Sequence, residues 1–63
     1  MVRANPANTR EYDDGRWHKE FYGLSTDTKP TEKLATGSLF IEVNTGDAYF
    51  FDEVSGTWIK AGG

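Results

Sequence analysis

A chain of 63 residues with no Cys, one His and a formal net charge of −3 has room for one domain, and a domain of this size buries only about 60% of the surface that its unfolded chain exposes. The lack of Cys excludes a disulfide framework, and a single His is a poor basis for a structural zinc site. Stability is therefore expected to come from oligomerisation or from docking on a larger assembly.

The distribution of charge and hydropathy argues against two classes of partner. Arg3 and Arg10 contribute +2 to the net charge of −3, so the remaining residues carry −5 and would repel a phosphate backbone. No apolar run approaches the roughly 20 residues of a membrane-spanning helix, and Met1 is followed by a polar stretch rather than a signal-peptide core. We expect a soluble protein made in a cytoplasm, with neither nucleic acid nor membrane as a partner.

Residues 1–15 are expected to form an extended N-terminal arm, followed by a small β domain at residues 16–63. The arm contains Pro6, an acidic run and few sizeable apolar side chains, too little to offset the entropy of ordering it as an isolated element. Two interpretations stay open. The segment is either a frayed terminus or an arm that becomes ordered by lying across a neighbouring subunit, with Arg3 and Arg10 making the contacts.

The next apolar pattern, at residues 16–22, alternates as a strand with mixed faces does, and Gly23 ends it. This strand is expected to pair with the sheet that follows it or with another chain. His18 is a candidate for acid–base chemistry, but the chain has no Cys and no Ser in a nucleophile-elbow context. A His in surface or interface packing is therefore favoured, and no catalytic residue is predicted.

Residues 24–37 are dominated by Ser, Thr, Asp and Lys and contain Pro30, which indicates a long connection. Leu34 is its one strong apolar anchor and is expected to pack on the sheet. Residues 31–34 suffice for one helical turn, which is too short to be a stable helix by itself.

The densest apolar pattern lies between Gly37 and Lys60 and predicts an antiparallel meander. Strands are expected at residues 38–43, 48–51 and 57–60, with a Gly-containing turn after each of the first two. With the strand before the long connection, the fold is predicted to be all-β, with three to four strands.

The first turn of this meander decides which side chains share a face. A three-residue loop at residues 44–46 with a bulge requires positive φ at Gly46 and pairs Phe40 with Phe50. A two-residue loop at Thr45 and Gly46 is less favoured and would mix the two faces. The three-residue loop predicts a sheet covered on both sides, with one face carrying Leu39, Ile41, Tyr49 and Phe51 and the other carrying Phe40 and Phe50.

The acidic side chains are expected to be solvated turn residues. Asp13, Asp14, Asp47, Asp52 and Glu53 lack the spacing of oxygen ligands in an EF-hand loop. Asp is common in turns because its side chain accepts hydrogen bonds from nearby backbone amides. No metal ion and no cofactor is predicted.

Two stretches of the sequence resemble small structural proteins of tailed bacteriophages. They are residues 22–31, YGLSTDTKPT, and residues 37–49, GSLFIEVNTGDAY, and the pattern closes on Asp52 and Trp58. In those proteins a Lys-Pro-Thr segment leads to Gly-Ser, a Phe-x-Glu strand, an Asp-Thr-Gly turn, a Tyr-containing strand and a terminal Trp. Asn44 stands where the pattern usually has Asp, and the chemistry of the turn tolerates either residue.

This resemblance implies a non-enzymatic protein of the virion, synthesised in the host cytoplasm. It implies a head-decoration, cement, head-fibre or tail-associated part that binds copies of itself and a larger capsid or tail protein. Aromatic side chains dominate the cores of protein interfaces. The residues expected to carry these contacts are Trp17, Phe21, Tyr22, Phe40, Phe50 and Trp58.

A second resemblance implies an alternative function. Residues 46–52 together with Trp58 resemble the second and third strands of a WW domain, in which a Tyr and a Trp grip a Pro-rich ligand. Leu39 stands where that family has its first Trp, Glu53 replaces its ligand-contacting His, and no Pro follows the last strand. The residues of this alternative peptide-binding site are Tyr49, Phe51 and Trp58.

Overall fold

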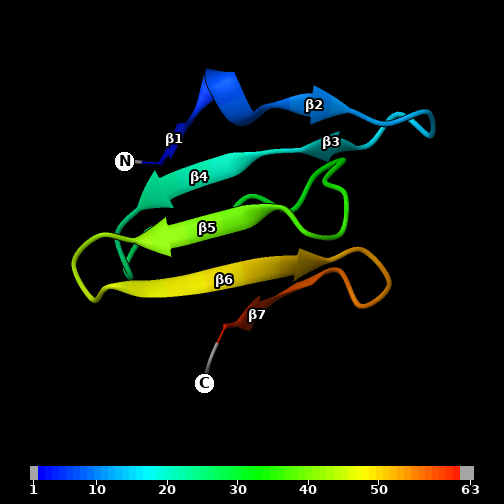
Figure 1. Cartoon of the computed structure of the whole chain (residues 1–63). Coiled ribbons are helices and arrows are strands. Elements are labelled where there is room, and N and C mark those ends of the chain that lie inside the picture. Colours follow the sequence, from blue (N-terminus) through cyan, green and yellow to red (C-terminus); the bar gives the residue numbers. More distant parts are fainter. Residues whose placement is uncertain (1, 62–63) are drawn as a thin grey trace.

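The computed structural model describes residues 2–61 and confirms the all-β prediction (Figure 1). A five-stranded sheet has the order β1-β4-β5-β6-β7, and a separate two-stranded ribbon pairs β2 with β3. The elements are β1 (Arg3–Ala4), the 3-10 turn η1 (Pro6–Asn8), β2 (Arg10–Glu11), β3 (Trp17–His18), β4 (Glu20–Gly23), β5 (Leu39–Glu42), β6 (Asp47–Asp52) and β7 (Thr57–Lys60).

The predicted meander is present, because β5 pairs with β6 and β6 with β7, both antiparallel. Its predicted register is wrong by one residue, since Phe40 lies opposite Tyr49 instead of Phe50. The loop holds residues 43–46 and is closed by a hydrogen bond of 2.8 Å from the Gly46 amide to the Glu42 carbonyl. Gly46 has a φ of 80°, which confirms its predicted left-handed conformation. A four-residue loop uses a Gly at this position as readily as a three-residue loop does.

The second turn, at residues 53–56, repeats the first. The Gly56 amide donates to the Asp52 carbonyl at 2.8 Å, and Gly56 has a φ of 68°. In both turns an acidic residue ends the strand, and Gly follows Thr or Ser at the end of the loop. The same local chemistry therefore closes both hairpins.

The strand predicted at residues 16–22 is divided into β3 and β4, and β4 runs parallel to β5. This parallel pair corrects the prediction of a purely antiparallel sheet. Parallel neighbours need a long crossover, which residues 24–38 supply by passing over one face of the sheet (Figure 1). Leu34 is buried in this crossover, as predicted, and the crossover is attached to β3 by the Trp17 amide, which donates to the Lys33 carbonyl at 2.8 Å.

The prediction of a separate N-terminal arm is corrected by the pairing of β1 with β4 and of β2 with β3. The Asn5 amide donates to the Glu20 carbonyl at 2.8 Å, which extends the contact beyond β1. Arg3 and Arg10 are both exposed and lie on edge strands of the chain's own domain. Backbone and polar side-chain hydrogen bonds hold this segment, which is why its low apolar content did not reveal the pairing.

The core lies between the sheet and the crossover. Its buried members are Phe21, Leu34, Phe40 and Phe51, with Val2, Tyr49 and Trp58 packed against them. The ring of Trp58 meets Phe51, Phe40 and Phe21 edge-on, with centroid distances of 5.2, 5.9 and 6.1 Å. The two predicted faces are therefore wrong: Phe40 shares a face with Tyr49 and Phe51, because the register differs by one residue and side chains alternate along a strand.

Candidate interaction surfaces

The sheet face that points away from the crossover carries an uncovered apolar row. Leu39 lies opposite Phe50 across β5 and β6, and Phe50 lies opposite Ile59 across β6 and β7. Phe50 is 48% exposed and Ile59 is 55% exposed, and Leu39 and Ile41 are half-buried. We call this surface the open face and define it by Leu39, Ile41, Phe50 and Ile59. The expectation of a sheet covered on both sides is not met by the described residues 2–61.

A polar cluster on the neighbouring strand borders the open face. The carboxylate oxygen Oε1 of Glu20 accepts hydrogen bonds from the Tyr22 hydroxyl, from Asn5 Nδ2 at 3.0 Å and from Asn8 Nδ2 at 3.2 Å. The Tyr22 hydroxyl, followed by the two amides, lowers the pKa of Glu20, and the same hydroxyl–carboxylate bond raises the pKa of Tyr22. The cluster fixes the N-terminal segment beside the open face.

The six predicted interface residues separate into three groups. Phe21 and Phe40 are buried in the chain's own core, so the prediction that they contact a partner is corrected. Trp58 is half-buried and packs on that core. Trp17 and Tyr22 are half-buried, and Phe50 alone among the six is an exposed large apolar side chain. The wrong register explains the error for Phe40.

Sequence reasoning missed three members of the open face, which are Leu39, Ile41 and Ile59. The two-residue alternation of β5 and β7 was visible in the sequence, but the predicted register placed Leu39 on the same face as Phe51, whereas Leu39 lies opposite Phe50. With a four-residue first loop, the same alternation yields the open face as observed.

The opposite, aromatic face is occupied by the chain's own crossover. Lys29 Nζ lies 2.7 Å from Glu42 Oε2 and 4.5 and 5.0 Å from the ring centroids of Tyr49 and Phe40. The ammonium group of Lys29, acting chiefly through its hydrogen bond, lowers the pKa of Glu42. Next in the chain, the Pro30 carbonyl accepts a hydrogen bond of 2.8 Å from Trp58 Nε1.

This arrangement bears on the WW-like alternative. Phe51 is buried in the core, so its predicted role in contacting a peptide is corrected. Tyr49 and Trp58 are half-buried and already contact the segment that contains Lys29 and Pro30. An external Pro-rich ligand would have to displace this segment.

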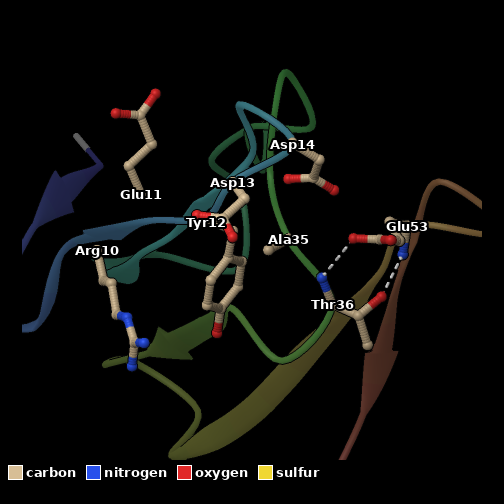
Figure 2. A pocket seen from close by; sticks show the side chains of 8 residues that line it. All are labelled: Arg10, Glu11, Tyr12, Asp13, Asp14, Ala35, Thr36 and Glu53. Atoms are coloured by element: carbon tan, nitrogen blue, oxygen red, sulfur yellow. Dashed lines mark hydrogen bonds between the residues drawn. The ribbon is translucent and has the colours of Figure 1, made fainter.

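A polar hollow lies beside the β2–β3 ribbon and is shown in Figure 2. Thr36 and Glu53 lie side by side among its lining residues and form two reciprocal bonds: the Thr36 amide donates to Glu53 Oε2 at 3.1 Å, and the Glu53 amide donates to Thr36 Oγ1 at 3.0 Å. Within residues 2–61, no cluster of three or more His, Cys, Asp or Glu side chains is arranged to hold a metal ion. The lining residues are Arg10, Glu11, Tyr12, Asp13, Asp14, Ala35, Thr36 and Glu53.

His18 lies on β3 opposite Arg10 of β2. It is half-buried in this ribbon, in keeping with a role in packing. No helix in the described part of the chain is both long enough and apolar enough to cross a membrane. Comparison with known protein families, curated proteins and solved structures finds no match to this chain.

Proposed function

We propose that this protein is a non-enzymatic structural component of a bacteriophage particle, a head-decoration, cement or fibre-type accessory protein. It acts by self-association and by docking on a larger shell protein. The open face is the observation that carries this proposal, because it presents an apolar row that residues 2–61 do not cover. The stretch from Tyr22 to Trp58 resembles small structural proteins of tailed phages, which supports a place for this protein in a phage particle.

The dimensions of the chain support a docking role. The molecule measures 34 × 24 × 18 Å along its principal axes, so its broad side is of the order of the roughly 800 Å² that each partner contributes to a standard protein interface. Each Å² of apolar surface that docking removes from water contributes about 25 cal/mol to the favourable free energy of association. Exposed apolar rows on small domains commonly mark contact sites, and Phe50 is the aromatic anchor of this one.

The WW-like alternative is disfavoured by the crossover. Its Lys29 and Pro30 already contact Tyr49 and Trp58, so peptide binding would break a hydrogen bond and an ion pair before it formed any contact. Docking through the open face requires no such rearrangement.

The test measures how many copies of the wild-type protein, and of two variants, are present in purified phage particles. Phe50→Ser removes the aromatic anchor and is expected to lower occupancy about tenfold, since burying the exposed half of a Phe contributes of the order of 1.4 kcal/mol. Tyr12→Ser is the matched control, because Tyr12 is an exposed aromatic residue away from the open face. Absence of the wild-type protein from the particles, or equal losses for the two variants, would overturn the proposal.

A further inference from the structure

We propose that copies of this chain join head to tail, with the apolar tip of the β6–β7 turn of one copy seated in a hollow at the opposite end of the next copy. The inference rests on the proposed self-association and specifies its geometry. The tip is Val54, in the turn at residues 53–56. The hollow is lined by Arg3, Tyr22, Gly23, Leu24 and Val43 and has a volume of about 330 Å³.

Val54 is an apolar knob held by a well-bonded turn. It is 92% exposed, yet its amide donates to Asp52 Oδ1 at 3.1 Å, and Ser55 Oγ donates to Asp52 Oδ2 at 3.0 Å. Glu53, the first residue of the same turn, is held in position by its two hydrogen bonds with Thr36. Val54 is therefore presented in a defined position, which lowers the entropy cost of seating it in a partner.

The hollow is also formed before any partner arrives. Its apolar walls are Leu24 and Val43, both exposed. The loops that carry them are joined by two bonds: the Ser25 amide donates to Asn44 Oδ1 at 2.9 Å, and Asn44 Nδ2 donates to Ser25 Oγ at 2.8 Å. The Val43 amide donates to the Gly23 carbonyl at 2.9 Å, which ties the β5–β6 turn to the end of β4.

Charge complementarity selects a second copy as the occupant. Arg3 is exposed on β1 at the rim of the hollow, whereas Asp52 and Glu53 directly precede Val54 in the turn. The Glu53 carboxylate already lies 3.9 Å from Arg16 Nε in its own chain, so seating Val54 in the hollow of the next copy brings Asp52 as the acidic group toward Arg3. Opposite charges at the rim of an interface steer association and fix its orientation.

The knob and the hollow lie at opposite ends of the sheet, since the β5–β6 turn and the β6–β7 turn flank β6 at its two ends (Figure 1). A contact between two different patches is heterologous, so it propagates into a ring or a row of copies. The open face, which carries Leu39, Phe50 and Ile59, takes no part in this contact and stays available for the shell protein.

The test uses two full-length variants and sedimentation analysis. Val54→Asp removes the knob and keeps the hollow, whereas Val43→Asp spoils the hollow and keeps the knob. Both positions are exposed turn residues, and unchanged melting temperatures will verify that the variants fold. Wild-type protein is expected to form oligomers that grow with concentration. Each variant alone should associate at least tenfold more weakly, by about 1.4 kcal/mol, whereas their equimolar mixture should form a one-to-one dimer that cannot extend.

Several outcomes would overturn this inference. A mixture that stays monomeric under conditions where the wild type assembles would exclude the head-to-tail contact. Loss of assembly in Phe50→Ser, with Val54→Asp unaffected, would show that the copies meet through the open face. A wild-type protein that occupies phage particles and yet stays monomeric in solution would overturn the head-to-tail contact and leave standing the proposed docking on a shell protein, whereas absence from the particles would overturn the proposed place in a particle and not the head-to-tail contact.

Discussion

The indole nitrogen of Trp58 donates a hydrogen bond of 2.8 Å to the carbonyl oxygen of Pro30, although the two residues lie 28 positions apart in the sequence. This bond joins the last strand to the crossover that covers the core. The Trp58 ring also packs edge-on against Phe51 and Phe40. One side chain therefore holds together the sheet and the segment that lies on it.

Replacing Trp58 separates these two contributions. Trp58→Phe keeps an aromatic ring but leaves the Pro30 carbonyl without its donor, so we expect a loss of about 1–3 kcal/mol in unfolding free energy. Trp58→Ala also leaves a cavity and is expected to cost about 3–5 kcal/mol. Denaturant unfolding measures both values, with Trp17→Phe as a control at the other Trp. A Trp58→Phe protein as stable as the wild type would show that the hydrogen bond contributes nothing net.

Stability in acid should depend on Glu42. Because Lys29 holds the folded-state pKa of Glu42 below its ordinary value of 4.5, the ionised carboxylate stabilises the fold above that value, and this contribution is lost as the pH falls through the folded-state pKa. In thermal melts between pH 7 and pH 2, the melting temperature of Glu42→Gln is expected to fall less with decreasing pH than that of the wild type. The control is Glu11→Gln, an exposed strand position, and an equal flattening in both variants would contradict the assignment to Glu42.

Local sequence patterns suffice to predict several elements of this fold. The strand predicted at residues 57–60 coincides with β7, both Gly-containing turns are found, and Leu34 packs on the sheet. Each of these depends on neighbours in the chain: alternation for the strand, positive φ for the turns, and a large apolar side chain in the middle of a polar loop.

Three features were not predictable in the same way. Gly46 fits a loop of three or four residues equally well, so the sequence left the register open by one position. The parallel pairing of β4 with β5 depends on the path of the crossover, which no short pattern reports. The open face follows from both, so its residues were divided wrongly between the two faces of the sheet.

Substitutions at Gly46 and at Gly23 are expected to destabilise the protein for different physical reasons. Gly46→Val places a β-branched residue at a φ of 80° and should cost more than about 1 kcal/mol. The Cβ of Gly23→Ala would lie 2.8 Å from Phe40 Cζ, so we expect a loss of about 1–3 kcal/mol from overpacking of the core. Gly46→Asn is the control, because Asn tolerates positive φ. Similar unfolding midpoints for Gly46→Val and Gly46→Asn would mean that backbone strain does not set the cost.

The N-terminal segment is expected to stabilise the domain that it pairs with. Deleting residues 2–9 removes the ladder between β1 and β4 and the contacts of Asn5 with Glu20. Each lost hydrogen bond contributes about 0.5–1.5 kcal/mol net, so the melting temperature should fall, and the amides of β4 should exchange faster with deuterium.

A single substitution tests the same pairing without shortening the chain. Asn5→Ala keeps the backbone of β1 but removes the bond from Asn5 Nδ2 to Glu20 and the cap that Asn5 Oδ1 provides to the Ala7 amide. We expect a loss of about 1–2 kcal/mol, smaller than the loss on deletion. If the deletion leaves both stability and β4 exchange unchanged, the segment is not held by its own chain, and the arm that lies across a neighbouring subunit becomes the better interpretation.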